Sequence, residues 1–343
     1  MSRAGNMPDT DPEFVRSQLV SRPTPVEAAP RLAQAIGLKA EDLWIKRDDL
    51  TGLGGGGNKA RKLEWTAGAA RAHGAATLVT SGAAHSNHAR LTAAAGARLG
   101  MDVVLVLSGT PGDAVTGNIV LDGLFGARIV WAGQVGEAAL EAAVADVAKE
   151  LRAKGGRPEV IPFGGSSVLG AQGYVEAGEE LLAQLPGLTS AVVAVGSGGT
   201  MAGLVRTLGA ERVLGVHCGA VPEPAQTVTR LVAGLSGDQQ NLRLRLRLDQ
   251  VGPGYSALTN QVREAMLTAA RTEGIVLDPV YTGRALAGLI AAVREGDVRA
   301  GEQTVLLHTG GLPGLFGHPE ALAQARSLVD AQSEQWHPGV SHR

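Results

Sequence analysis

The sequence predicts an α/β fold made of two open, twisted sheets, each with helices on both faces. Short runs of β-branched and apolar residues alternate with alanine-rich helical patterns, which is typical of parallel α/β layers. Several runs end in a glycine or serine turn, and open α/β sheets bind ligands at the carboxyl ends of their strands. A length of 343 residues gives room for about two domains.

Strands are expected where apolar runs are short and bounded by turn residues. In chain order these runs are Ala76–Thr80, Val103–Leu107, Arg128–Trp131, Val160–Phe163, Ala191–Val195, Val213–Cys218 and Thr304–His308. The run Leu242–Leu248 alternates leucine with arginine, so we interpret it as a half-buried edge strand that its charges protect from aggregation.

The helical patterns between these runs complete two lobes. They cover Asn87–Leu99, Gly136–Ala153, Tyr174–Leu185, Met201–Leu208 and Ser256–Glu273. The first four strands place residues 62–168 in a small α/β domain, and residues 1–61 and 169–343 would form a larger, discontinuous domain. Such a split leaves a cleft between the lobes, which is a usual place for a cofactor.

Composition and charge exclude several classes of protein. The net charge is −2 and the pI is about 6.5, so nothing favours binding to nucleic acid or an anionic membrane. The single cysteine, Cys218, is expected in the core, and no ligand cluster predicts a metal site. No apolar run reaches the ~20 residues of a membrane span. The segment Met1–Arg16 lacks the apolar stretch of a signal peptide, so a cytoplasmic location is expected.

The run of four glycines that ends at Gly57 precedes Asn58 and Lys59, where a helix is expected to begin. Backbone without Cβ atoms permits close approach by a flat ligand. A lysine at its rim can lose its hydration and become a nucleophile that forms an imine with an aldehyde cofactor. The pattern is not a Walker phosphate loop, because Asn58 interrupts it and Ala60 replaces the hydroxyl residue. A solvated lysine on a flexible loop remains the alternative.

A second glycine turn, Gly196–Thr200, follows a predicted strand and opens a helix. The start of such a helix offers N–H groups and a positive dipole end that bind phosphate. A dinucleotide site would want an acidic residue about twenty positions further on, and Val216–Gly219 supplies none. A smaller phosphate therefore fits better than NAD, although a plain turn, or a NAD-dependent dehydrogenase, remains an alternative.

Further polar residues lie at other strand ends. Ser86 or Asn87 would cap a helix, or else Asn87 would donate to a phenolate oxygen while Ser86 meets a substrate carboxylate. Thr309 would offer a neutral hydroxyl to a ring nitrogen. Tyr255 and Tyr281 both lie beside turns rich in glycine or proline, where core or capping roles are also open.

Together these segments resemble the pyridoxal-phosphate enzymes of the tryptophan synthase β-like fold (fold type II). Within that fold they resemble the D-cysteine desulfhydrases and 1-aminocyclopropane-1-carboxylate (ACC) deaminases. The segments that carry the resemblance are Lys46–Gly52, Gly57–Lys59, Ser86–His88, Gly117–Asn118, Gly196–Thr200, Asp278–Gly283 and His308–Gly311. Each is weak alone, but in family order they are specific. His85 departs from the pattern, because relatives usually have glutamine there.

The resemblance implies a cofactor and its ligands. Lys59 would hold pyridoxal 5′-phosphate as an imine, Asn87 would bond to its 3′-oxygen, and Thr309 would face its pyridine nitrogen. The implied cofactor-binding residues are Asn58, Lys59, Asn87, Gly196, Ser197, Gly198, Gly199, Thr200 and Thr309. The implied catalytic residues are Lys59, Ser86 and Tyr281.

Within this branch the sequence favours D-cysteine desulfhydrase, which eliminates sulfide from a small amino acid and yields pyruvate and ammonia. By the resemblance, ACC deaminases carry glutamate where this chain has Thr309, and a hydroxyl gives only a moderate electron sink. That strength suffices when a good leaving group is on Cβ. ACC deaminase, L-cysteate sulfo-lyase and a non-catalytic protein that binds pyridoxal phosphate remain alternatives. A homodimer is expected, because dimers are common in this fold.

Overall fold

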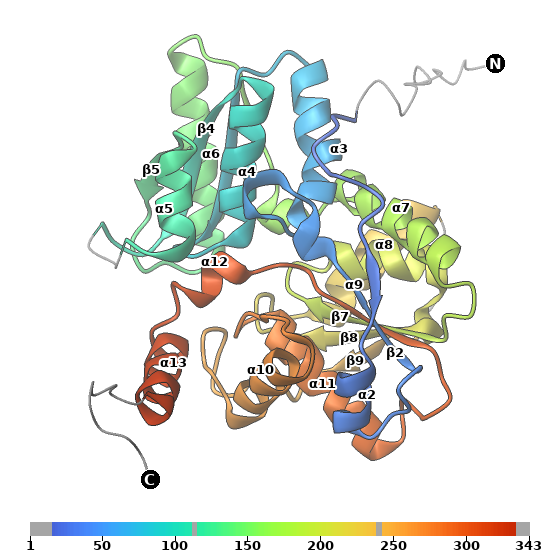
Figure 1. Ribbon diagram of the computed structural model, residues 1–343. Coiled ribbons are helices and arrows are strands. Elements are labelled where there is room, and N and C mark those ends of the chain that lie inside the picture. The colour runs from blue at the N-terminus through green and yellow to red at the C-terminus, as the bar shows by residue number, and fades with distance from the viewer. Residues whose placement is uncertain (1–15, 112–114, 238–241, 334–343) are drawn as a thin grey trace, which may run out of the picture.

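The computed structural model describes residues 16–111, 115–237 and 242–333, and it contains two separate sheets (Figure 1). The larger sheet has the strand order β1-β2-β10-β7-β8-β9, and the smaller has the order β5-β4-β3-β6. Among the strands in the described residues, only β1 and β2 pair antiparallel. The strands are β1 (Val26–Ala28), β2 (Leu43–Lys46), β3 (Thr77–Ala83), β4 (Asp102–Ser108), β5 (Arg128–Trp131), β6 (Pro158–Val160), β7 (Ser190–Val195), β8 (Val213–His217), β9 (Arg245–Arg247) and β10 (Thr304–Leu307).

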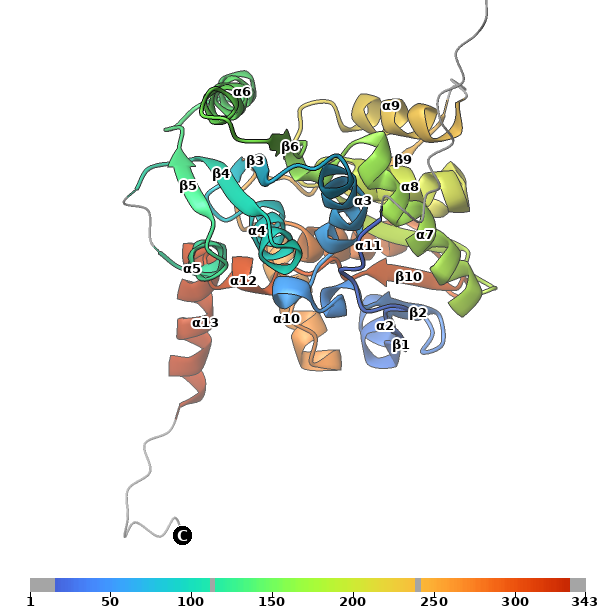
Figure 2. The ribbon, with the colours of Figure 1, turned by 90° about the horizontal axis from the view of Figure 1, so that it is seen from above.

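Helices cover both faces of each sheet, as Figure 2 shows from above. They are α2 (Pro30–Ile36), α3 (Lys59–Ala72), α4 (Asn87–Leu99), α5 (Gly117–Leu124), α6 (Glu137–Ala153), α7 (Val168–Gln184), α8 (Gly199–Leu208), α9 (Pro224–Ser236), α10 (Asn260–Glu273), α11 (Thr282–Glu295), α12 (Leu312–Leu315) and α13 (Pro319–Gln332). Helix α13 extends away from the rest of the chain and buries only Ala321. Within the described ranges no helix combines the length and apolar character that a bilayer crossing requires.

Strand β7 shows how the sheets form their cores. Its side chains alternate between faces, so Val192 and Ala194 pack with α2, α10 and α11, whereas Val193 and Val195 pack with α7, α8 and α9. Both faces are buried, which explains why the strand is a continuous apolar run. The small sheet divides in the same way, with α3 and α4 on one face and α6 on the other.

The seven apolar runs all contribute strands, but the fourth is displaced. The expected strand Val160–Phe163 is wrong in its bounds, because only Val160 belongs to β6 and Phe163–Gly165 forms a 3-10 turn. The sequence did not predict β1 and β2, which span three and four residues. As expected, the first four predicted strands, which are β3 to β6, form a sheet of their own. The domain boundaries remain a prediction, and α3 runs through the first of them.

The alternating leucine and arginine segment forms an edge strand, as predicted, although only Arg245–Arg247 pair with β8. Arg245 binds Asp297 at 2.9 Å, and Arg247 binds Asp249 and Glu295. Both edge arginines are therefore paired with acidic side chains.

Cys218 is fully buried, and burial raises the pKa of its thiol to about 12, so it is the predicted core cysteine.

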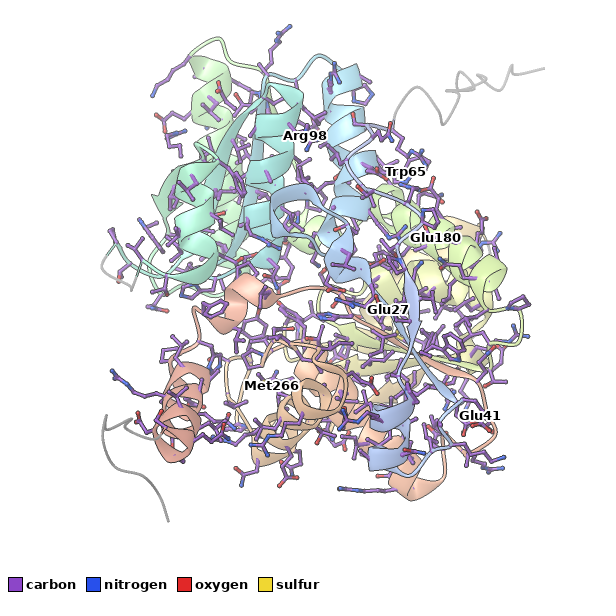
Figure 3. All side chains as sticks on the ribbon, viewed as in Figure 1. Glu27, Glu41, Trp65, Arg98, Glu180 and Met266 are labelled. Carbon is purple, nitrogen blue, oxygen red and sulfur yellow. The ribbon has the colours of Figure 1, made fainter. Side chains whose placement is uncertain are left out.

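A buried ion network anchors the helix that follows the glycine run. Arg61 of α3 is fully buried and donates to both carboxylate oxygens of Asp48 at 2.9 and 3.1 Å. It also donates to Glu180 of α7, the residue labelled in Figure 3. Burial alone would raise the pKa of Asp48, but the Arg61 charge holds that pKa below its ordinary value. The network thus fixes the first turn of α3 against α7 and the N-terminal segment.

Candidate active site

A cavity of about 230 Å³ lies where the two sheets meet. Its walls include Ser81 and Ser108 at the carboxyl ends of β3 and β4, and Ala194 near the carboxyl end of β7. The predicted site residues that line it are Asn58, Lys59, Ser86, Asn87, Gly196, Ser197, Gly198, Thr200, Tyr281 and Thr309. Gly199 is the one predicted residue that does not line it. The fold thus gathers in one cleft residues that are up to 251 positions apart (58 to 309).

The glycine run is a fixed turn rather than a flexible loop. Gly56 has φ +74°, and a Cβ there would lie 1.7 Å from the carbonyl oxygen of Asp49, so only glycine fits. Arg90 of α4 donates to the carbonyl oxygens of Gly54 and Gly56, each at 2.9 Å. These contacts set the direction in which the chain enters α3 at Lys59.

Lys59 directs its amine into the cavity, where Nζ donates to the Gly164 carbonyl at 3.1 Å and lies 3.4 Å from Ser197 Oγ. Burial lowers the pKa of this amine from 10.5 to about 8. At pH 7 such a lysine is neutral in about one molecule in ten, against about one in three thousand for an ordinary lysine. The structure therefore favours the nucleophilic lysine over the solvated one.

Lys62 is a second amine in this region, and the sequence analysis did not single it out. It is almost fully buried, and its Nζ donates to Ser166 Oγ at 2.9 Å. Burial, followed by the nearby Lys59 charge, lowers its pKa well below the ordinary value. The signal was its position three residues after Lys59, which places both side chains on one face of α3.

The second glycine turn forms the start of α8. Gly198 caps the helix with φ +83°, and the Gly199 N–H donates to Ser166 Oγ at 3.1 Å. Asn58 Nδ2 donates to Thr200 Oγ1 at 3.0 Å, so the two glycine turns are joined directly. A helix N-terminus with adjacent hydroxyl groups is the donor set that a phosphate requires.

Ser86 and Asn87 begin α4. Ser86 Oγ accepts a hydrogen bond from the Ala89 N–H at 3.2 Å, so it caps the helix as well as lining the cavity. Asn87 Oδ1 accepts from Asn118 Nδ2 at 3.0 Å. His85 is not among the cavity-lining residues. Its ring lies against Gly317 instead.

Two tyrosines close another side of the cavity. The hydroxyl groups of Tyr255 and Tyr281 hydrogen-bond to each other, and their rings meet edge to face with centroids 6.1 Å apart. Burial raises the pKa of both phenols, to about 12 for Tyr255. Asp278 fixes Tyr281 by accepting its backbone N–H at 2.9 Å. The sequence noted Tyr255 without a role, and the structure pairs it with Tyr281.

Thr309 follows β10, and its carbonyl oxygen accepts from the Asn58 N–H at 3.0 Å. Its hydroxyl makes no hydrogen bond to any other residue in the described part of the chain and so remains available to a ligand in the cavity.

Across residues 16–111, 115–237 and 242–333, no cluster of histidine, cysteine or carboxylate side chains is arranged to hold a metal ion.

Beside the site, Arg90 faces the fully buried carboxyl group of Asp122 on α5. Neither carboxylate oxygen of Asp122 has a hydrogen-bond partner within the described ranges. Burial raises the pKa of Asp122 to about 7, and the Arg90 charge offsets only part of that increase. The ionised form of this group is therefore unfavourable in the folded chain.

Replacing Asp122 with asparagine is expected to flatten the dependence of stability on pH. Because its pKa is raised on folding, the folded state holds more protons than the unfolded state between pH 3.8 and about 7, so stability falls as pH rises. At pH 8 the free energy of unfolding of the variant should exceed that of the parent chain by up to about 4 kcal/mol. At pH 4 the two free energies should be nearly equal. Urea unfolding at both pH values measures this difference, and an equal difference at both would contradict the raised pKa.

The donor set fits one kind of cofactor well. A buried amine with a lowered pKa suits an aldehyde, the start of α8 suits a phosphate, and the Thr309 hydroxyl suits a ring nitrogen. Comparison with known families agrees, since residues 18–310 match the family model described as pyridoxal-phosphate dependent enzyme. The chain belongs to this family. Its cofactor is pyridoxal phosphate, and the predicted fold type II is confirmed.

Individual relatives agree over almost the whole chain. A protein of Pyrococcus furiosus, provisionally named 1-aminocyclopropane-1-carboxylate deaminase, is 39% identical over 324 residues, covering 90% of this chain and 96% of that protein. The D-cysteine desulfhydrase of Salmonella schwarzengrund is 39% identical over 325 residues, covering 89% and 97%. The crystal structure of an ACC deaminase homologue superposes with a TM-score of 0.82 at 37% identity, covering 91% of this chain and 96% of that one.

Proposed function

We propose that this pyridoxal-phosphate enzyme is a D-cysteine desulfhydrase, which acts on D-cysteine or a related β-substituted amino acid. The observation that carries this proposal is the neutral Thr309 hydroxyl in the cavity. When bound, pyridoxal phosphate withdraws electrons from the substrate Cα. A carboxylate at the position of Thr309 would keep the ring nitrogen protonated and strengthen that withdrawal. A hydroxyl strengthens the electron withdrawal less than a carboxylate does. The weaker withdrawal is still enough for elimination when a good leaving group is on Cβ.

Each site residue then has a proposed role. Lys59 would hold the cofactor aldehyde, the Gly196–Thr200 turn its phosphate, and Asn87 its 3′-oxygen. Once displaced by the substrate, the Lys59 amine would take the Cα proton on Nζ, for which its lowered pKa keeps a neutral fraction available. Ser86 and Tyr281 would line the substrate pocket.

The overall reaction balances without any further reagent except water. The Cα–H bond breaks with its proton going to Lys59 Nζ, and the Cβ–S bond breaks with its electron pair leaving on sulfur. Water then hydrolyses the three-carbon product, which gives pyruvate and ammonia beside the sulfide. No oxidant or reductant is needed.

Relatives in both branches of the family keep a second candidate open. The similarity to proteins named for ACC deaminase, including a solved homologue, supports ACC as an alternative substrate. L-Cysteate sulfo-lyase and a non-catalytic protein that binds pyridoxal phosphate remain further alternatives. The products separate these functions, because only ACC yields α-ketobutyrate and only cysteate yields sulfite.

A substrate panel tests the proposal. We expect D-cysteine to give pyruvate, ammonia and sulfide in equal amounts, at least about tenfold faster than L-cysteine, L-cysteate, D-serine or ACC. The measurement is keto-acid and ammonia release from the cofactor-loaded protein at equal substrate concentration. Faster release of α-ketobutyrate from ACC would assign the chain to the deaminases, and no release from any compound would support the non-catalytic alternative.

Assembly and location are also proposals. We expect a homodimer, which is supported by the exposed apolar side chains of Leu124, Phe316 and Val329 on and around α5, α12 and α13. Light scattering of the purified chain would measure its mass. A cytoplasmic location remains a prediction, because Met1–Arg16 lies almost wholly outside the described residues.

A further inference from the structure

We propose that Asn118 is a positioning residue that fixes which way the Asn87 amide faces, so that Asn87 presents its NH₂ group to the cofactor. This inference rests on the proposed role of Asn87 as a partner of the 3′-oxygen. Asn118 itself does not line the cavity and would act only through Asn87.

The hydrogen bonds determine the orientation of both amides. Asn118 Nδ2 lies 2.7 Å from the backbone carbonyl oxygen of His85 and 3.0 Å from Asn87 Oδ1. A backbone carbonyl can only accept, so Asn118 must place its NH₂ group at this point. The second hydrogen of that group is then directed at Asn87, which must offer its oxygen in return. The NH₂ group of Asn87 is left for the cavity that this residue lines.

The backbone around Asn118 holds it at this position. It is the second residue of α5, and the preceding Gly117 has φ +54°. A Cβ on Gly117 would lie 2.5 Å from the Pro313 carbonyl oxygen, so the start of α5 is pressed closely against α12. The helix therefore has little freedom to move the amide away from Asn87.

The unmet half of the Asn118 amide is a second, independent observation. Asn118 is fully buried, and its Oδ1 has no hydrogen-bond partner among the residues that the structure describes. A buried polar atom without a partner lowers stability, and a residue that served packing alone would not need it. The two hydrogen bonds that Asn118 donates thus account for a buried amide at this position, and one of them goes to Asn87 of the candidate active site.

Without Asn118, either orientation of Asn87 would be allowed. In the wrong orientation its oxygen would face the 3′-oxygen of the cofactor, which accepts hydrogen bonds, and two acceptors repel each other. Binding of pyridoxal phosphate should weaken as a result. The pH midpoint of its visible absorbance should move upward, because an N–H donor stabilises the anionic oxygen.

The test is a double-mutant cycle on cofactor affinity. In Asn118→Leu the side chain keeps its approximate size and loses its donors, and the dissociation constant of pyridoxal phosphate should rise about tenfold. In the Asn87→Ala background the same change should alter it less than about twofold, because the amide that it orients is gone. Val120→Ala, at an exposed position of the same helix, is the control and should bind as the parent does.

Each outcome decides between the proposals. An unchanged dissociation constant and pH midpoint in Asn118→Leu would overturn the positioning role, as would an equal loss in both backgrounds. A parent chain that binds no pyridoxal phosphate would instead refute the proposed function. If Asn118→Leu does not fold by circular dichroism, Asn118→Asp replaces it in the cycle, and failure of both to fold would show a structural role and reject the proposal.

Discussion

Replacing Lys59 with alanine is expected to abolish both turnover and the visible absorbance of the cofactor-loaded protein. The amine is the proposed nucleophile of the cavity, it lies beside Gly164 and Ser197, and burial has already lowered its pKa to about 8. Loss of the group that binds the aldehyde and takes the Cα proton should reduce kcat by at least about 10³-fold. Absorbance spectra and keto-acid release measure the two effects.

The matched control is Lys154→Ala, because Lys154 is an exposed residue directly after α6 and forms an exposed ion pair with Glu150. Its spectrum and activity should equal those of the parent. Full activity in Lys59→Ala would reject the assignment of Lys59 and, with it, the proposed mechanism. Lys62→Met separates the two neighbouring amines, since only loss of Lys59 should remove the visible band.

Replacing Arg61 with methionine is expected to destabilise the chain by about 3–5 kcal/mol. Methionine fills part of the volume, but it leaves the fully buried carboxylate of Asp48 without the cation that binds it, whereas Glu180 keeps its ion pair with Lys46. The uncompensated charge of Asp48, rather than the loss of the pair itself, is the source of the cost. The measurement is the urea dependence of unfolding of the cofactor-free chain.

A partly exposed arginine on the edge strand provides the comparison. Arg245 pairs with Asp297, whose side chain is 48% exposed, so solvent screens this pair and Arg245→Ala should cost less than about 1 kcal/mol. Equal losses for the two variants would mean that burial does not control the value of these ion pairs. An unchanged free energy of unfolding in Arg61→Met would show that the network contributes nothing to stability.

The strands of both sheets could be predicted because their apolar runs are continuous and bounded by turns. β7 is one example, since both of its faces are covered by helices and nearly every residue is therefore apolar. Strands β1 and β2 escaped prediction because they are short, and their place beside β10 depends on contacts with residues that lie far away in sequence. The register of a short strand is a tertiary property.

The site could be predicted in part for a similar reason. Lys59 and the Gly196–Thr200 turn lie next to local signals, namely glycines that permit unusual backbone and a strand that leads into a helix. Lys62 and Asn118 were not assigned a role from the sequence, because burial and a partner from another element give them their properties.

By itself the sequence determined the α/β class, the two sheets, the pyridoxal-phosphate family resemblance and the identity of the candidate nucleophile. The class and the sheets follow from periodicity, the candidate nucleophile from residues that are adjacent in the chain, and the family from its resemblance to known motifs in their order. The tertiary structure alone decided the lowered pKa of Lys59, the orientation of Asn87 and the pairing of Tyr255 with Tyr281. Desolvation and hydrogen-bond geometry depend on distances between segments that only folding brings together.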